Sequence, residues 1–511
     1  MKFKYLAFSL LSVVSLAGCQ DLNEDPRADL TPDTYFKSQS DLDGAVASMF
    51  RVLAVDGSWG FTSRMTSYFG ADDLTTDPGL NKEDMREFDR LQGSANNSSL
   101  VAQWEGPWKA IYQANNILAN YEKVENSTET AKNESAGEAL FIRGLCYYYL
   151  VRTFGDLPLI TAPIDVNERP AREPVTTIYE QIITDLKEAI SKLPETSIPG
   201  KPNQLSSKAL LADVYLTMAG WPLKDESKYA ESASMAKEVM NSNAYSLLSD
   251  YLEVFQTNNH SEVVFALEYN VDNGLPQRSF GSSCVPLEEE ALNGQTGWDD
   301  YYSEINFYKN APKCKRTDET FYTTFKLLNK ETKTFDLVPW DSPKTRVQHP
   351  YYKKFRAGLG GDGVTETETE LISMNPSTNK ALDIIRYAMV LLNYAEASCM
   401  ANGGPTTESY SAINEVRTRA GLPSLTSGLS QTAFRDSVVY ERAYECAGEF
   451  GTRWFDIVRL QLLPQVMAAR ATENENELNP TYKADPSTRY LAPIPFKEMV
   501  RNPAWSQNTG Y

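Results

Sequence analysis

The sequence lacks the residue patterns on which many catalytic and metal-binding sites depend. It contains only two histidines in 511 residues, His260 and His349, and they are not spaced as metal ligands. There is no HExxH and no GxSxG sequence. The acidic runs at 288–290 and 299–300 could serve a glycosidase, but only if two carboxylates stood at a set separation in space. These absences favour a binding protein, and we expect no catalytic residues and no cofactor.

Cysteine is scarce and forms no recognisable motif. Five cysteines follow Cys19, with no CxxC pair among them: Cys146, Cys284, Cys314, Cys399 and Cys446. An odd number without regular spacing is neither a disulfide framework nor a zinc motif. Most of them lie in helix-like segments, where a cysteine usually acts as a small buried hydrophobe. Cys284 and Cys314 lie in a loop-rich region and could pair, an alternative that the sequence leaves open.

Positive charge is in deficit. The chain has 49 Lys and Arg against 68 Asp and Glu, a formal net charge of −19. A field of this sign repels phosphate backbones, so we expect no nucleic-acid partner.

Long apolar runs are also missing, apart from a short leader. The run from Leu6 to Ala17 follows Lys2 and Lys4 and is shorter than the roughly 20 residues that span a bilayer. A basic flank, a short apolar core and small residues before a break are typical of a signal peptide. The residues 16–19, LAGC, resemble a bacterial lipobox, in which the cysteine is acylated and becomes the new N-terminus. The alternative is an ordinary signal peptide that happens to contain a cysteine.

The sequence therefore predicts a signal peptide at 1–18, lipidation of Cys19 and a lipidated tether at 19–40. Several acyl chains on one cysteine would anchor the protein stably, because each buried methylene contributes about 0.8 kcal/mol. Acidic residues just after Cys19 resemble a surface-export signal, so we expect the anchored protein to face outward: Asp21, Glu24 and Asp25.

Helical periodicity dominates the two ends of the chain. Residues 137–154 repeat apolar side chains at helical spacing, and a glycine follows at 155. The segments 206–240 and 384–420 each have about the length of a tetratricopeptide helix pair, near 34 residues. We therefore expect a mainly α fold, in which tetratricopeptide-like helix-turn-helix pairs form a scaffold.

The middle of the chain is different. Residues 251–380 have few helical runs and many Gly, Pro, Tyr and Trp, and residues 261–270 alternate as a strand. Long irregular segments in a helical scaffold usually carry function. We divide the chain into a helical part at 41–250, a large irregular loop and short-strand insertion at 251–380 that carries the ligand site, and a completing part with an extended tail at 381–511.

Exposed aromatic rings beside polar side chains are the pattern to seek, if the ligand is a sugar. A sugar ring has an apolar C–H face, which an aromatic platform covers, and hydroxyl groups that Asn, Asp and Arg can bind. The candidate ligand-binding residues are Trp298, Trp340, Tyr301, Tyr302, Trp59, Asp73 and Asn96. For each aromatic ring the alternative is burial beneath a loop. Three acids could instead hold a calcium ion: Asp299, Asp300 and Glu304.

Several blocks of sequence together resemble the SusD/RagB family. The blocks at 141–160, 385–397, 413–423 and 441–460 read FIRGLCYYYLVRTFGDLPLI, IRYAMVLLNYAEA, INEVRTRAGLP and ERAYECAGEFGTRWFDIVRL. The chain then ends with YLAPIP at 490–495 and NPAWSQNTGY at 502–511. These blocks keep the family's order over most of the chain. The departures are minor, because Cys446 and Ala447 stand where the family often has Leu or Phe.

The resemblance implies a surface lipoprotein of a Bacteroidetes-type outer membrane that is not an enzyme. Members of this family bind oligosaccharides, or in some branches peptides, and act as hinged lids over a SusC-like TonB-dependent transporter. The partners that we expect are thus an oligosaccharide, the transporter and the outer membrane. The alternatives are a peptide-binding lid, a surface glycoside hydrolase and a structural surface protein without a small ligand.

Overall fold

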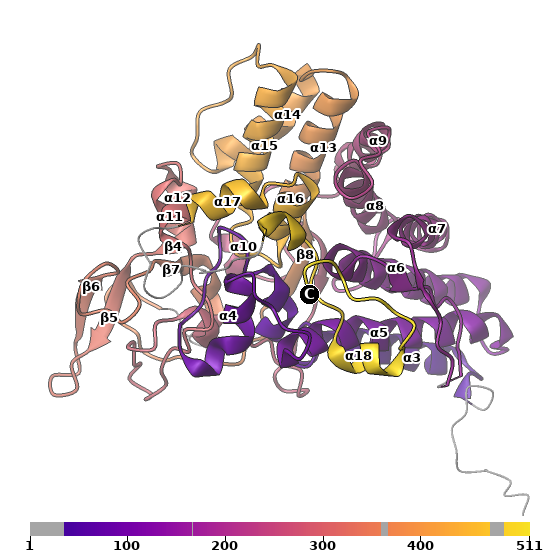
Figure 1. Ribbon diagram of the computed structural model, residues 1–511, viewed down its shortest axis with the longest axis horizontal. Coiled ribbons are helices and arrows are strands. Elements are labelled where there is room, and N and C mark those ends of the chain that lie inside the picture. The colour runs from indigo at the N-terminus through magenta and orange to yellow at the C-terminus, as the bar shows by residue number, and fades with distance from the viewer. Residues whose placement is uncertain (1–34, 166, 359–365, 471–484) are drawn as a thin grey trace, which may run out of the picture.

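Helices, together with short 3-10 turns, make up about half of the part of the chain that the computed structural model describes, residues 35–165, 167–358, 366–470 and 485–511 (Figure 1). The leader and Cys19 lie outside these residues. The helices before the insertion are α3 (Gln39–Ala54), α4 (Glu83–Asp89), α5 (Ser98–Asn120), α6 (Glu129–Phe154), α7 (Val175–Lys192), α8 (Gln204–Met218) and α9 (Lys228–Asn241). Those after it are α13 (Tyr387–Ala401), α14 (Thr407–Arg419), α15 (Gln431–Glu445), α16 (Thr452–Arg459), α17 (Leu463–Ala469) and α18 (Phe496–Arg501).

The insertion contains shorter elements. Its helices are α10 (Glu253–Gln256), α11 (Ile305–Lys309), α12 (Lys315–Thr320) and the 3-10 turns η4 (Gly281–Cys284) and η5 (Lys353–Gly358). Its strands are β3 (Val263–Leu267), β4 (Phe321–Tyr322), β5 (Thr324–Leu328), β6 (Phe335–Pro339) and β7 (Tyr351–Tyr352). Outside it, β1 (Leu157–Pro158) and β2 (Arg172–Glu173) lie between α6 and α7, and β8 (Leu382–Arg386) directly follows the insertion. The strands pair two by two, as β1–β2, β3–β8, β4–β7 and β5–β6.

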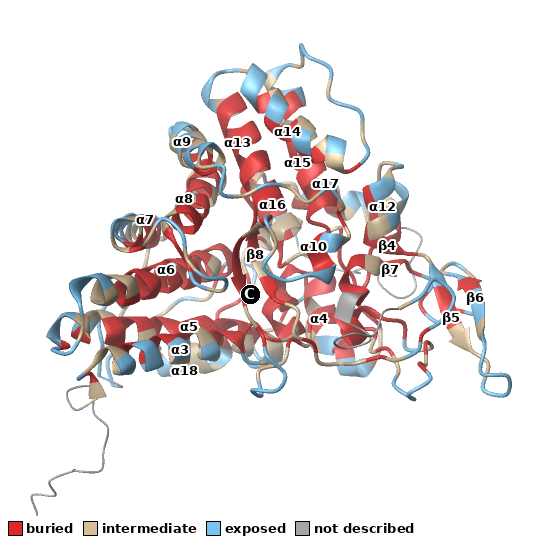
Figure 2. Cartoon of the chain, turned by 180° about the vertical axis from the view of Figure 1, so that it is seen from behind, coloured by how far each residue is buried: buried red, intermediate tan, exposed pale blue. Residues whose placement is uncertain are grey.

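Helix α6 lies at the centre of the N-terminal scaffold. The Thr128 hydroxyl accepts a hydrogen bond from the backbone N–H of Ala131 at 3.2 Å and caps its first turn. Gly155 ends the helix with φ = 73°, a left-handed conformation that favours glycine. From Ser135 onward nearly every side chain is buried, because α5 and α7 pack on either side of it. Figure 2 shows this continuous buried band running through α5, α6, α13 and β8.

The predicted helix pairs are confirmed. Helices α8 and α9 form one pair, joined at Gly220-Trp221-Pro222, and α13 and α14 form another, joined at Gly403-Gly404-Pro405. Helix α13 also packs against α9 and α15, so the two pairs stack on each other (Figure 1). A scaffold of stacked helix pairs with a short-strand insertion is the fold class that the sequence predicts.

The first helix of the pair predicted at 384–420 begins later than expected. Residues Leu382–Arg386 form strand β8, which pairs antiparallel with the predicted strand β3, and the helix begins only at Tyr387. A short apolar run suits a buried strand as well as a buried helix, and periodicity cannot separate the two. The strand pair ties the start of the insertion to the completing half of the scaffold.

The insertion protrudes from the scaffold as an irregular lobe, on the left in Figure 1. It holds a small apolar cluster of its own, with Trp340 packed against the edge: Tyr302, Tyr322, Phe325, Val347 and Tyr351. The predicted domain boundaries at 250 and 380 stay a prediction. Among the described residues, no helix is long and apolar enough to cross a bilayer.

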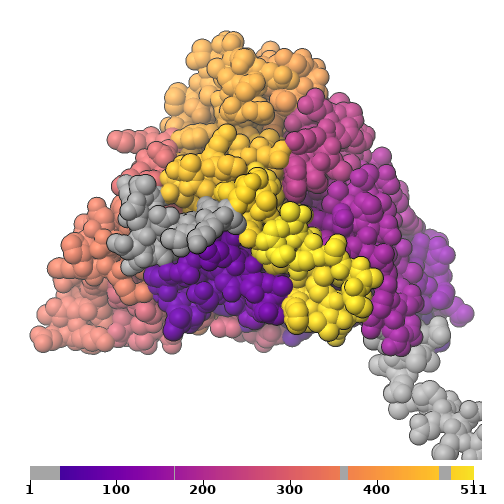
Figure 3. Space-filling view, viewed as in Figure 1, coloured from indigo at the N-terminus to yellow at the C-terminus, as the bar shows by residue number. Residues whose placement is uncertain are grey.

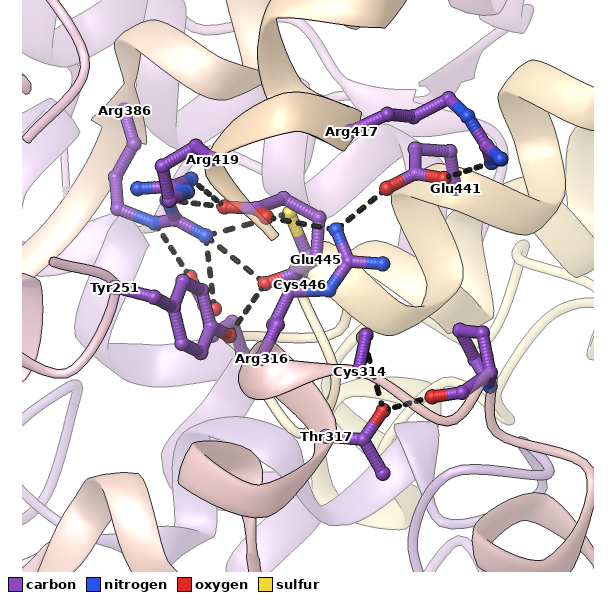
Figure 4. Close-up of polar contacts among 12 residues, drawn as sticks. Tyr251, Cys314, Arg316, Thr317, Arg386, Arg417, Arg419, Glu441, Glu445 and Cys446 are labelled. Carbon is purple, nitrogen blue, oxygen red and sulfur yellow. Dashed lines mark hydrogen bonds and ion pairs between the residues drawn. The ribbon is translucent and has the colours of Figure 1, made fainter. Parts of the chain in front are cut away.

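The cysteines of the described chain are all free thiols, so Cys284 and Cys314 do not pair. Cys284 is buried in η4 and donates to the Gly281 carbonyl oxygen at 3.4 Å. The Cys314 sulfur lies 3.5 Å from the Thr317 hydroxyl at the start of α12 (Figure 4). Each thiol therefore contacts a polar group of its own turn and not the other cysteine.

A buried network of ion pairs joins the insertion to the scaffold (Figure 4). Arg316 of α12 contacts Glu441 at 2.5 Å and Glu445 at 3.1 Å, both on α15. Glu445 also contacts Arg386 of β8 at 3.0 Å and Arg419 of α14 at 2.5 Å. All five side chains are almost completely buried. The network therefore fixes where the insertion stands on the helical scaffold.

Candidate functional site

The loop that carries Trp298 is held close to the backbone of a neighbouring turn. A Cβ atom at Gly297 would lie 2.1 Å from the carbonyl oxygen of Pro286 and 2.2 Å from that of Val285, so the position requires glycine. The next residue, Trp298, donates its backbone N–H to the Ser282 carbonyl oxygen at 2.8 Å. The indole ring itself is only half-buried. A fixed backbone thus presents a partly open ring.

Three further side chains surround this ring, and together with Trp298 we call them the Trp298 cluster: Asp56, Phe61 and Arg278. The Phe61 and Trp298 ring centroids lie 6.3 Å apart with the rings at 77°. The guanidinium of Arg278 lies 5.4 Å from each centroid, within the range of a cation–π contact. Asp56 pairs with Arg278 at 2.6 Å, and the two side chains are 42% and 35% exposed. The cluster therefore offers ring surface, a donor and an acceptor to solvent.

Two buried aspartates hold the loop that carries Trp298 in place. Asp299 adopts a positive φ of 52° and accepts a hydrogen bond from the Tyr351 hydroxyl at 2.6 Å. It also pairs with Arg346, and its neighbour Asp300 pairs with Lys82. Burial raises the pKa of both carboxyl groups, against the effect of these cations. A loop held by several buried contacts is preorganised for binding.

The three acids considered as an alternative calcium site do not form one. Each of the three acids is paired with a different basic side chain: Asp299 with Arg346, Asp300 with Lys82 and Glu304 with Arg470. In the described part of the chain, no three His, Cys, Asp or Glu side chains come together as metal ligands. The basic side chains supply the compensating charge that a calcium ion would bring.

Four of the candidate ligand residues lie in the core instead of on the surface. Tyr301 and Tyr302 are 0% exposed, and Trp59 and Asp73 are 2% exposed. The Tyr301 hydroxyl donates to the Ser279 carbonyl oxygen at 2.7 Å, so both the ring and its polar end are used inside the protein. We therefore leave these four residues out of the proposed contact surface.

Trp340 and Asn96 are accessible but lie elsewhere. Trp340 is half-buried after β6 and packs edge-on against Tyr308, with centroids 5.9 Å apart. Asn96 is exposed in the loop before α5. None of the described ring or hydrogen-bond contacts joins either residue to Trp298. Of the candidate set, Trp298 alone belongs to the cluster.

Sequence reasoning missed the other three members of the Trp298 cluster. It singled out Trp59, whereas Phe61, two residues later, is the ring near the surface. Arg278 comes to the site from the insertion, 222 residues after its partner Asp56. The only available signal was the presence of a cation and an acid close in sequence to aromatic residues. Such a pattern does not show which side chains meet in the folded protein.

Asp73 is expected to make stability depend on pH. Burial raises its pKa to about 7, opposed by the hydrogen bond from the Gly448 N–H. Since the folded state holds this proton more tightly than the unfolded state, stability should fall as pH rises from about 4 to about 7 and then level off. Asp73→Asn keeps the acceptor for Gly448 and carries no charge. We expect it to raise the urea midpoint at about pH 8 and to change it little near pH 4.

The neighbouring Asp72→Asn is the matched contrast. Asp72 pairs with Arg453 at 2.6 Å, so its loss should lower the midpoint near neutral pH. An unchanged midpoint of Asp73→Asn at about pH 8 would contradict the proposed role of the Asp73 proton.

Comparisons with known proteins agree with this architecture. A family model described as the SusD family matches residues 221–511, and one described as "Starch-binding associating with outer membrane" matches residues 22–216. SusD-like protein P2 of Formosa agariphila is 29% identical over 99% of this chain and 100% of its own length.

Solved structures are similar over nearly the whole chain. A SusD homologue from Bacteroides thetaiotaomicron has a TM-score of 0.80 at 23% identity and covers 94% of this chain and 98% of its own. Surface glycan-binding protein A from the same species, in complex with laminarihexaose, has a TM-score of 0.73 at 19% identity and covers 92% of this chain and 100% of its own. These structures support the fold, and the family model over 221–511 spans more than half of the sequence. The chain therefore belongs to the SusD family.

Proposed function

We propose that the protein captures oligosaccharides at the cell surface through the Trp298 cluster. The observation that carries this proposal is the half-open Trp298 ring on a preorganised loop, with the Arg278–Asp56 pair beside it. The ring face covers the C–H face of a sugar and excludes water from it. Arg278 donates to sugar hydroxyls, and Asp56 accepts from them. This combination of a flat apolar surface and a few polar groups is typical of small-ligand sites.

Binding without turnover fits the chemistry of the cluster. Glycoside hydrolysis by the usual mechanisms needs two carboxyl groups on either side of the scissile bond, about 5 to 9.5 Å apart. Asp56 is the one carboxylate among the four cluster residues, and it pairs with Arg278. The family and its glycan-binding relatives support the same view, since one relative is described in complex with laminarihexaose.

The proposed setting is the outer membrane, with the protein anchored by lipid on Cys19 and facing outward. The lipobox-like sequence at 16–19 and a family model described as associating with the outer membrane support this placement. A SusC-like TonB-dependent transporter is the proposed recipient of the ligand. The predicted tether at 19–40 overlaps the folded body at its end, because Phe36 is buried and α3 begins at Gln39. The residues between Cys19 and this point would let the body hinge above the transporter as a lid.

The test is a glycan array followed by calorimetry, with the soluble chain from residue 20. Removing Cys19 removes the lipid anchor but leaves the described fold and the Trp298 cluster intact. We expect saturable binding of one class of oligosaccharide without release of shorter products. A folded protein that binds no glycan but binds peptides on a parallel peptide array would overturn the proposal in favour of a peptide-binding lid.

A further inference from the structure

A cavity of about 530 Å³ lies where the end of α6, the start of α7, α16 and the C-terminal segment meet. Figure 3 shows this C-terminal segment, in yellow, lying against the purple and magenta N-terminal half of the chain. The volume is within the range of small-ligand sites, about 300 to 1,000 Å³. None of the residues that line the cavity belongs to the Trp298 cluster. Its aromatic lining comes from four residues: Tyr179, Trp221, Phe455 and Tyr490.

Arg152, at the end of α6, borders this cavity with a guanidinium group that lies between two aromatic rings. The central carbon of the group lies 3.6 Å from the centroid of the Tyr148 ring and 3.7 Å from that of the Phe455 ring. The side chain is only 7% exposed. With its faces covered, the guanidinium can meet a ligand only at its edge, where the N–H bonds point outward.

One nitrogen at this edge has no acceptor in the described part of the chain. The Arg152 Nε donates to the Tyr148 carbonyl oxygen at 3.3 Å. The Nη1 lies 3.7 Å from a carboxylate oxygen of Asp213, which is longer than a hydrogen bond. The Nη2 makes no hydrogen bond to a described residue, and it is not one of the unpaired polar atoms that lack accessible surface. An acceptor on a ligand can therefore bind to it.

Three more polar groups of the lining have no hydrogen-bond partner among the described residues: the hydroxyls of Tyr179 and Tyr490 and the indole N–H of Trp221. The two tyrosines are 2% and 4% exposed, and Trp221 is half-buried with its ring centroid 5.3 Å from that of Tyr490. None of the three groups is fully shielded from solvent. Burial raises the pKa of Tyr179, so its hydroxyl stays protonated and can donate.

The lining carries more positive than negative charge, although the whole chain has a net charge of −19. It contains Arg152, Arg172 and Arg459 against the single acid Asp156. Arg459 is neutralised by acidic side chains of α13 and α16, at 2.6 and 2.8 Å. Arg172 instead donates to three backbone carbonyl oxygens and to the Asn508 side-chain oxygen, which carry no charge. The cavity therefore favours an anion.

We propose that this cavity binds a sugar acid, that is, a sugar ring that carries a carboxylate. The carboxylate accepts hydrogen bonds from the edge of Arg152, and a ring oxygen accepts one from the Tyr179 hydroxyl. The C–H face of the ring lies on Trp221. Arginine and indole nitrogens only donate, so a ligand rich in acceptors suits the unpaired groups of the lining. The site goes beyond the proposed function and does not depend on the Trp298 cluster.

The test uses fluorine NMR of the chain from residue 20 labelled with 5-fluorotryptophan. All 8 tryptophans of the sequence remain in this chain. Trp221→Phe assigns the resonance that reports on the cavity. The labelled protein is titrated with glucuronate and galacturonate at millimolar concentration, and with glucose and galactose as the matched neutral sugars. We expect at least one of the two acids to shift the Trp221 resonance with saturation, and its neutral counterpart to leave the resonance in place.

Variants test the two proposed polar contacts. Tyr179→Phe removes a hydroxyl that has no partner in the described chain, so the fold should hold. We expect it to weaken binding of the acid about three- to tenfold. Arg152→Lys keeps the charge but loses the planar edge of donors, and we expect it to weaken binding more than tenfold. Tyr112→Phe removes an exposed hydroxyl outside this cavity and should leave the affinity unchanged.

The outcomes that would overturn the inference are distinct. A Trp221 resonance that neither acid moves would reject the site. Equal shifts with an acid and with its neutral counterpart would reject the preference for a carboxylate. Unchanged affinity in both Tyr179→Phe and Arg152→Lys would reject the proposed contacts, and Tyr179→Phe alone decides if Arg152→Lys does not fold. A failure at Trp221 leaves the proposed function standing, because that function is tested at Trp298.

Discussion

Replacing Glu445 with alanine is expected to lower the free energy of unfolding by about 3–5 kcal/mol. The Glu445 carboxylate contacts Arg316 at 3.1 Å, Arg386 at 3.0 Å and Arg419 at 2.5 Å, and it is fully buried (Figure 4). Its removal leaves three buried guanidinium groups with less compensating charge. Removing one partner of a buried ion pair lowers the free energy of unfolding much more than replacing the whole pair with apolar residues of similar volume does. The urea midpoint near neutral pH measures the change.

The exposed helix residue Glu231 is the matched control. It pairs with Lys228 at 2.6 Å on α9, and its side chain is partly open to solvent. Exposed pairs of this kind contribute about 0–1 kcal/mol, so Glu231→Ala should shift the midpoint little. A Glu445→Ala protein as stable as Glu231→Ala would contradict the structural role of the network.

Acid should weaken the same network in a defined range. Burial alone would raise the pKa of Glu445, but Arg419, Arg386 and Arg316 outweigh it and hold the pKa at about 2. A carboxyl group with a lowered folded-state pKa stabilises the protein fully above its unfolded value, near 4.5, and loses this contribution as pH falls toward 2. The stability difference between the native protein and Glu445→Gln should therefore shrink below about pH 4.5.

How much of the fold can be predicted from the sequence depends on how far apart along the chain the interacting residues lie. Helix α6 is visible in the sequence because its apolar spacing and the glycine at 155 act within a few turns. The family resemblance likewise rests on contiguous blocks, and the family model over 221–511 confirms it. The predicted helix start at 384 was wrong, because residues Leu382–Arg386 form strand β8, and only the partner strand β3 decides that this run is extended.

The candidate site was harder to predict because exposure is set by distant residues. Trp59 has the neighbours expected of a surface ring in sequence, yet Tyr149 and Phe450 pack edge-on against it with centroids 5.0 and 4.9 Å away. These partners are far along the chain and leave no mark on the local sequence around 59. The same holds for Arg278 and Asp56, which meet only in the folded protein.

Replacing Trp298 with alanine is expected to weaken oligosaccharide binding about thirtyfold or more, the loss typical of a central aromatic contact. The indole supplies the ring of the Trp298 cluster, and its removal also takes away the cation–π contact that places Arg278. The backbone of the loop should hold, because its anchors are the Ser282 carbonyl oxygen and the side chains of Asp299 and Asp300. Calorimetry with the oligosaccharide identified on the array measures the effect, and the thermal midpoint verifies the fold.

Trp340→Ala separates a specific loss from a general one. Trp340 is half-buried in the same insertion and packs against Tyr308, so its removal should lower stability but leave the affinity unchanged. Arg278→Met tests the polar half of the cluster, since it keeps the aliphatic stem but removes the donors. If Trp340→Ala abolished binding while Trp298→Ala did not, the ligand would lie on the outer edge of the insertion. The rigid loop below Trp298 would then have a structural role only, in spite of its open ring.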